Sequence, residues 1–189
     1  NAYTKNLTVL NFSASNDPDF TEGIDTLYYL IYWSDNNINY YLSANTTQTN
    51  FSTNATADGT YYYLVNVSDL SSIAEGNVWN WSLDTTPPRI SLISPADGTV
   101  FTDIEKIDIT FRFSSNETAK NCTMYLDGSI AGNESKQQTL YNLTVTNIDV
   151  GNHNWNATCY DLANNLGSST LFSFKFDIIS GTGGGTEQP

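Results

Sequence analysis

The sequence predicts an all-β protein made of two β-sandwich domains in tandem. Short runs of alternating apolar and polar residues recur along the chain, separated by clusters of Asn, Asp, Gly and Ser. Such alternation is typical of strands with one buried face. No stretch shows the 3.6-residue period of an amphipathic helix. One segment also recurs at an offset of 92 residues, which indicates two copies of one kind of domain.

The alternating runs predict the strands in chain order. Before the paired prolines, strands are expected at residues 7–14, 26–33, 38–43, 60–67 and 78–83. After the prolines, they are expected at residues 89–93, 106–113, 120–126, 138–146, 153–160 and 169–177. Residues 69–75 (DLSSIAE) favour one short helical turn instead.

The internal repeat consists of two similar segments, DGTYYYLVNVSDL (58–70) and VGNHNWNATCYDL (150–162). At the constant offset of 92 residues, the matched pairs are Gly59 and Gly151, Tyr63 and Trp155, Val65 and Ala157, Val67 and Cys159, and Asp69 and Asp161. Each copy is followed by a loop and one last strand. The two segments therefore correspond to the same strand of two similar domains.

The stretch DTTPP (84–88) is the expected joint between these domains. Proline fixes its own φ and pushes the preceding residue into extended geometry, so a short, stiff spacer is expected. The predicted organisation is a first domain over 1–84 with a short or missing first strand, a second domain over 85–179, and a Gly-rich linker-like tail over 180–189. A proline-rich loop inside one domain is the alternative.

About seven short strands per domain, with turn signals between them, is the pattern of an immunoglobulin-like sandwich. The stretch VLNFSASNDPDFTEGIDTLYYLIYWSD (9–35) is also similar to fibronectin type III-like modules of prokaryotic surface proteins. The stretches DTTPPRISLISPADGT, NCTMYLDGS and NATCYDLANNLG resemble Ig-like repeats of archaeal cell-surface, S-layer-type proteins. The resemblance covers nearly the whole chain, but its motifs mark a type of module rather than an activity.

The two cysteines, Cys122 and Cys159, both lie in the second domain. Alternation places each on the inward face of its strand, and these strands are neighbours in the sandwich order. A disulfide between them is therefore expected and would close a loop of about 38 residues. The chain-entropy model makes such a bridge worth roughly 3–4 kcal/mol. Two buried free thiols in a cytosolic protein are the alternative.

Twelve N-x-S/T sequons indicate an extracellular glycoprotein. The composition, with 23 Asn and 43 Ser plus Thr among 189 residues, predicts about five by chance. Several of these asparagines alternate with apolar residues and should point outward, where a glycan can be attached. An Asn- and Thr-rich composition that makes sequons incidentally is the alternative. The predicted sites are Asn6, Asn11, Asn45, Asn50, Asn54, Asn66, Asn80, Asn116, Asn121, Asn133, Asn142 and Asn156.

Charge restricts the range of partners. The 20 acidic and 7 basic residues give a net charge of −13, so the chain lacks the basic stripe that nucleic acids or anionic membranes require. A halophilic acidic surface is a rival interpretation. No apolar run approaches the ~20 residues of a transmembrane helix. The start at Asn1 shows no signal-peptide pattern, which predicts a mature, trimmed or partial chain.

No catalytic residues are expected. The single histidine, His153, falls at a strand position of the repeat. The sequence shows no nucleophile elbow and no zinc-protease motif. Aromatic residues crowd the first domain, and the outward ones (Tyr29, Tyr41 and Tyr62) are candidates for a sugar-stacking platform. Ordinary strand propensity explains the same tyrosines.

The acidic loop SNDPDFTEGID (15–25) is a candidate calcium site, with Asp17, Asp19 and Asp25 as ligands. Calcium prefers six to eight oxygen ligands, which carboxylates, carbonyls and water supply. The spacing of these acids is not that of an EF-hand loop, and Asp is common in turns for other reasons. Apart from calcium, no cofactor is expected.

These features favour a non-catalytic structural or adhesive module of a glycosylated cell-surface protein, such as a wall, stalk or filament component. Its expected partners are other surface-protein subunits or domains, and glycans. The first alternative is an accessory carbohydrate-binding module of a secreted enzyme. The second is a filament subunit joined to its neighbours by β-strand addition, because an open sandwich edge invites an extra strand.

Overall fold

The computed structural model describes residues 3–4, 9–12, 26–53, 55–69, 71–103 and 105–179. The chain divides into two compact units, Asn1–Thr86 and Pro87–Pro189, and every sheet takes its strands from one unit only. The division falls inside the DTTPP segment. In the first unit, Thr85 donates from its backbone N–H and its hydroxyl to Asp58 Oδ1, at 2.8 and 2.7 Å. The residues that precede the prolines are therefore anchored to the first unit.

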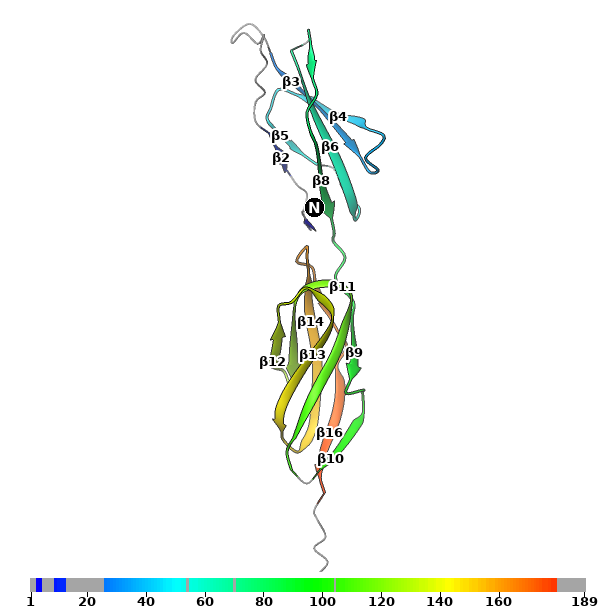
Figure 1. The fold of residues 1–189 in the computed structure, drawn as a ribbon, viewed down its shortest axis with the longest axis vertical. Helices are drawn as coiled ribbons and strands as arrows, with labels where there is room; N and C mark the ends of the chain where they lie inside the picture. Colours follow the sequence, from blue (N-terminus) through cyan, green and yellow to red (C-terminus); the bar gives the residue numbers. More distant parts are fainter. Residues whose placement is uncertain are drawn as a thin grey trace, which may run out of the picture. The chain divides into compact units, whose positions relative to one another are not determined.

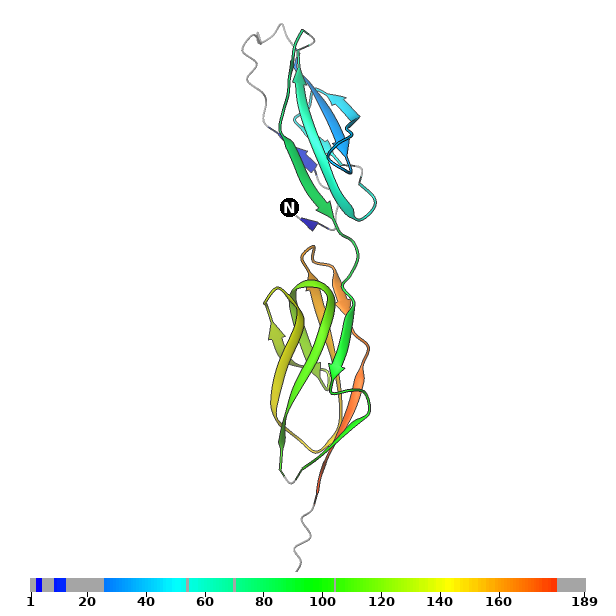
Figure 2. The same cartoon turned by 45° about the vertical axis from the view of Figure 1, so that its right-hand side comes forward.

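The first unit is a two-layer sandwich (Figures 1 and 2). Its larger sheet has the order β1-β8-β6-β3-β4, and β7 pairs with β6. These strands are β1 (Tyr3–Thr4), β3 (Tyr28–Ser34), β4 (Tyr41–Thr46), β6 (Gly59–Ser68), β7 (Ile73–Ala74) and β8 (Val78–Leu83). The second layer is an antiparallel pair, β2 (Val9–Asn11) and β5 (Asn50–Ser52).

Alternation along β3 and β6 builds the core of the first unit. Ile31, Tyr63 and Trp81 are buried, and residues of the small sheet, Leu10 and Phe51, pack against them. Phe12 follows β2, and its ring lies 4.8 Å from that of Tyr29. Because β2 and β5 are only three residues long, they cover only part of the larger sheet.

The second unit is a more complete sandwich built around one long strand, β11 (Ile107–Leu126). The first half of β11 pairs with β9 (Ile90–Ser94) and β13 (Gln138–Ile148), and its second half pairs with β12 (Ser129–Glu134) and β14 (Gly151–Asp161). Beyond β14, the sheet continues through β16 (Phe172–Ile178) to β10 (Thr99–Asp103), while β15 (Leu166–Ser168) pairs with the end of β14. One strand thus contributes to both layers.

The core of the second unit is rich in aromatic residues. Phe111, Phe113, Tyr141, Trp155 and Phe176 are fully buried. The rings of Phe113 and Tyr141 stack at 5.1 Å, and Phe111 meets Trp155 edge-on at the same distance. The strict alternation of buried residues at the end of β14 reflects the period of two of a strand with one inward face.

Three predicted elements differ in the structure. The strand expected at 38–43 begins at Tyr41, because Asn36 Oδ1 accepts the N–H groups of Ile38 and Asn39 and holds those residues in a turn. The two strands expected at 106–113 and 120–126 are one strand, β11. The helical turn expected at 69–75 is wrong: Asp69 accepts the N–H groups of Ser71 and Ser72, and a short strand, β7, follows.

Candidate functional site

The disulfide of the second unit joins Cys122 of β11 to Cys159 of β14, the pair expected from the sequence. The two residues are direct partners in the antiparallel register, with their Cα atoms 4.1 Å apart. Both are buried in the aromatic core. The bridge therefore ties the two middle strands of the sheet together inside the sandwich.

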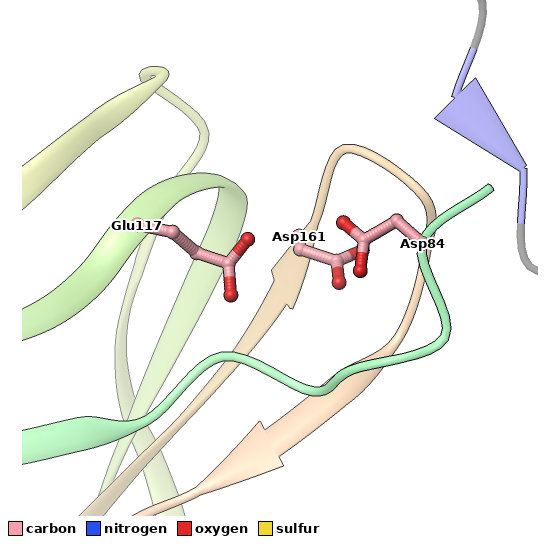
Figure 3. A group of neighbouring side chains, drawn as sticks. All are labelled: Asp84, Glu117 and Asp161. Carbon is pink, nitrogen blue, oxygen red and sulfur yellow. The ribbon is translucent and has the colours of Figure 1, made fainter. Parts of the chain in front are cut away.

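An acidic pair lies on these same strands. Figure 3 shows Glu117 on β11 and Asp161 at the end of β14, and their carboxylate oxygens come within 4.8 Å of one another. Asp161 is fully buried, and its carboxylate accepts the backbone N–H and the side-chain amide of Asn165 at 2.8 and 2.9 Å. These hydrogen bonds give Asp161 a structural role as the anchor of the turn at 161–165.

The sequons of the described residues place most of their asparagines on the surface. The exposed ones are Asn11, Asn45, Asn50, Asn80, Asn116, Asn133 and Asn142, and the half-buried ones are Asn66, Asn121 and Asn156. Asn66 Oδ1 accepts the N–H of Gly76 at 3.2 Å, and Asn142 Oδ1 accepts Arg112 Nε–H at 3.0 Å. Asn6 and Asn54 lie outside the described residues.

The sugar-stacking platform expected from Tyr29, Tyr41 and Tyr62 is not formed. Tyr29 is only 3% exposed and packs on Phe12 in the core. Tyr41 lies opposite Trp33 in the register, on the inner side of the sheet, whereas Tyr62 alternates with Tyr61 and Tyr63 and faces the other side. Sequence alternation could not assign these faces because several successive residues of these strands are aromatic.

A different group of aromatic residues lines a pocket in the first unit. This aromatic pocket has a volume of about 250 Å³ and is lined by Trp33, Ser43, Ala55, Thr56, Tyr61 and Tyr63. The ring of Trp33 lies 6.1 Å from that of Tyr41 and 6.4 Å from that of Tyr61. Ser43 and Thr56 are exposed, so their hydroxyls add hydrogen-bonding groups beside the aromatic rings.

A larger apolar groove lies in the same unit, between the small sheet and β8. This groove, of about 760 Å³, is lined by Val9, Leu10, Asn11, Phe12, Tyr29, Tyr63, Val65, Val67, Gly76, Asn77, Trp79, Asn80 and Trp81. Trp79 and Trp81 share one face of β8 by alternation, yet Trp81 is 5% exposed and Trp79 is 66% exposed. Among the described residues, the opposite layer therefore leaves the first residues of β8 uncovered.

His153 bridges two loops of the second unit. Its Nδ1 lies 2.8 Å from Asp127 Oδ2, and its Nε2 lies 2.8 Å from the carbonyl oxygen of Asp149. Burial lowers the pKa of His153, but the hydrogen bonds to Asp127 and to the Asp149 carbonyl outweigh this and raise its pKa above the usual value. The ring also stacks on Phe174, so its contacts are those of a structural residue.

The calcium ligands expected in the first unit, Asp17, Asp19 and Asp25, lie outside the described residues. No helix in the described part of the chain is long and apolar enough to cross a membrane.

One family model matches part of the second unit. Residues 88–157 match the model of the bacterial Ig domain family. The second unit is an Ig-like module. The match covers less than half of the chain, and it spans β9 to the middle of β14, including β11 and Cys122.

Several solved structures are similar to this chain at low sequence identity. The fibronectin(III)-like modules of Clostridium thermocellum CbhA are 16% identical with a TM-score of 0.41, covering 48% of this chain and 98% of theirs. The BSP domain of a biofilm-associated protein is 11% identical with a TM-score of 0.34, covering 81% and 28%. A Jonesia denitrificans lytic polysaccharide monooxygenase is 13% identical with a TM-score of 0.34, covering 44% and 60%. Identities and TM-scores this low indicate nothing about function.

No curated protein matches this chain. The indications of function therefore come from the residues of the two units themselves. Sequence reasoning found the disulfide and the sequons but missed the aromatic pocket and the groove. The exposure of Trp79 had no signal in the sequence, because its alternation with Trp81 is that of a buried residue.

Proposed function

We propose that this chain is a non-catalytic, extracellular structural or adhesive segment of a glycosylated cell-surface protein of the archaeal, S-layer-like kind, serving in a wall, stalk or filament. The observation that carries the proposal is the buried Cys122–Cys159 disulfide. Disulfides of this kind persist in oxidising, extracellular compartments and are rare in the cytosol. Ig-like modules act most often as scaffolds, and their fold by itself supplies no reaction.

The sequons support the same proposal. The exposed asparagines project from strands of both units, where an attached glycan would not disturb the core. Charged residues are only 14% of the chain, so glycans would also supply the hydrophilic surface that charge does not. The partners that suit such a surface are other subunits or domains of the same cell envelope.

The test is mass spectrometry of the protein purified from its own organism. We expect glycopeptides at the exposed sequons, with higher occupancy at Asn45, Asn133 and Asn142 than at the half-buried Asn121 and Asn156, because a glycosylating enzyme has to reach the amide. Cys122 and Cys159 should resist alkylation until a reductant is added. Unmodified sequon peptides together with two free thiols would refute an extracellular glycoprotein.

The aromatic pocket favours a second candidate function, an accessory carbohydrate-binding module. Trp33 and Tyr61 offer ring faces, and Ser43 and Thr56 offer hydroxyls, in a space of about 250 Å³. Ligand sites commonly combine apolar walls with a few polar groups in this way. Tyr41, which is 58% exposed, extends the aromatic surface beside Trp33.

Binding to a glycan array separates the two candidates. A carbohydrate-binding module should retain specific oligosaccharides, and Trp33→Ala should abolish that retention. Tyr62→Ala is the matched control, because it removes an aromatic ring from the opposite face of the same sheet. Uniform absence of binding, or equal losses in both variants, would remove this candidate.

A further inference from the structure

Two copies of one short motif lie side by side on the outer face of the second unit. The motif is Asn-x-Thr-x-Tyr, and it occurs at residues 121–125 of β11 and at residues 156–160 of β14. Because side chains alternate along a strand, its Asn, Thr and Tyr share one face. The residues between them include the disulfide cysteines, Cys122 and Cys159, which are buried in the core. The Asn, Thr and Tyr of both copies therefore point away from the core.

The antiparallel register places the asparagine of each copy opposite the tyrosine of the other. Asn121 is the direct partner of Tyr160, and Asn156 is the direct partner of Tyr125. The two threonines lie opposite one another at the centre. Residues directly opposite in an antiparallel pair have their Cβ atoms about 4.5–5.5 Å apart. Each sequon asparagine therefore lies beside an aromatic side chain of the neighbouring strand.

One exposed aliphatic residue continues each pair onto the next strand. Tyr125 has Ile130 of β12 as its other neighbour, and Tyr160 has Leu166 of β15. Ile130 is 69% exposed and Leu166 is 48% exposed. Each row forms a track of roughly 10 Å across the sheet, because neighbouring strands lie about 4.8 Å apart. The two tracks are Asn121, Tyr160 and Leu166, and Asn156, Tyr125 and Ile130.

We propose that N-linked glycans attached to Asn121 and Asn156 pack along these tracks, over the tyrosine and the aliphatic side chain of each. The inference rests on the proposed glycoprotein function and states where two of its glycans lie. A pyranose ring has a face of C–H groups, which can stack on a tyrosine ring as another flat apolar group does. Both asparagines are half-buried, so the first sugar emerges among these side chains rather than in open water.

The face itself favours a glycan over a protein partner as its cover. Exposed apolar side chains that cluster on a surface often mark a place of contact. The attachment points lie in the same rows as these side chains, so an attached glycan has no distance to cross before it meets them. A second copy of this chain carries the same net charge of −13 and is repelled.

The experiment is tyrosine nitration by tetranitromethane, read by peptide mass spectrometry, on the full chain produced in a host that attaches N-glycans. Thr123→Val removes the sequon of Asn121 and keeps a β-branched side chain. It should raise the nitration of Tyr160 several-fold and leave that of Tyr125 unchanged. Thr158→Val should do the reverse, because it removes the other sequon. A general loosening of the fold would expose both tyrosines in both variants.

The same face offers a matched control. Ser135→Ala removes the sequon of Asn133, which lies opposite Thr123 rather than opposite a tyrosine. This variant should leave the nitration of both tyrosines as it is in the native chain. All three variants and the native chain, produced in a host without N-glycosylation, should be nitrated equally, which excludes an effect of the substitutions themselves.

Peptide mass spectrometry of the same samples separates this inference from the proposed function. Glycans at Asn121 and Asn156 on which nitration does not depend would overturn the inference alone. Glycans at other sequons but none at these two would do the same. Protection that persists without glycans and falls on dilution would show that a second copy covers the face instead. Unmodified sequons throughout native material, together with two free thiols, would overturn both proposals.

Discussion

His153 shows how one side chain joins two loops of the second unit. Both acceptors that face its ring, the Asp127 carboxylate and the Asp149 carbonyl, can only accept hydrogen bonds, so the doubly protonated ring satisfies both. Lys106 pairs with the Asp149 carboxylate nearby. The arrangement favours the charged imidazole, in agreement with the raised pKa of His153.

We therefore expect a histidine-dependent change of stability with pH. Because the folded pKa of His153 is raised above its unfolded value of about 6.5, the contribution of the charged ring is fully present below that pH. It is lost as the pH rises through the folded pKa. His153→Gln should cost about 1–2 kcal/mol at low pH. It should cost less at pH values above the folded pKa.

Thermal melting of the second unit at a series of pH values, for the native chain and for His153→Gln, measures this difference. His153→Phe keeps the stacking on Phe174 without the hydrogen bonds, and it separates the two contributions. A difference between the native chain and His153→Gln that is constant across the series would show that His153 acts through packing alone.

At the scale of elements, β11 and β14 are the two strands that the disulfide of the second unit joins. Their register places Cys122 opposite Cys159 and Met124 opposite Ala157, all of them inward. The disulfide joins two residues that lie 37 positions apart along the chain. A cross-link over such a distance restricts the unfolded chain much more than the folded one.

The double variant Cys122→Ala/Cys159→Ala should therefore lose about 4 kcal/mol of unfolding free energy in the second unit on the chain-entropy model. Denaturant unfolding, with the native chain in reductant as a second measurement, tests this value. Reductant should have no effect on the double variant itself. A loss well below 1 kcal/mol would mean that β11 and β14 hold together without the bridge.

At the scale of the whole molecule, the two units have separate cores. The core of the first unit contains Ile31, Tyr63 and Trp81, and that of the second contains Phe111, Trp155 and the disulfide. The first unit leaves Trp79 and Val78 exposed, so it removes less apolar surface from water than a closed sandwich would. We therefore expect the first unit to have a smaller free energy of unfolding than the second.

Calorimetry of the full chain should show two unfolding transitions, the first belonging to residues 1–86. Reductant should lower only the second transition, because the disulfide lies in the second unit. A single transition that reductant shifts as a whole would mean that the units unfold as one cooperative body.

The sequence alone determined two kinds of feature: strands, which follow from hydrophobic alternation, and the disulfide, which follows from the positions of the cysteines. Alternation predicted β3, β6, β8, β13 and β14 close to their observed bounds, because a strand with one inward face repeats every two residues. It also placed Cys122 and Cys159 on facing inward positions, and the repeat predicted that β6 and β14 are equivalent strands. Short strands such as β5, β10 and β15 were missed, because three to five residues contain too little alternation.

Only the tertiary structure decided which inward side chains are covered. Trp79 and Trp81 have the same place in the pattern of β8, and they differ in exposure because burial depends on the opposite layer rather than on the strand itself. The same holds for Tyr29 and Tyr41, one buried and one exposed on the inner side of one sheet. Local sequence determines which face of the sheet a side chain points to, because successive residues of a strand alternate. Long-range packing determines whether the opposite layer covers that side chain. Where inward side chains of the first unit are left uncovered, they line the groove and the pocket.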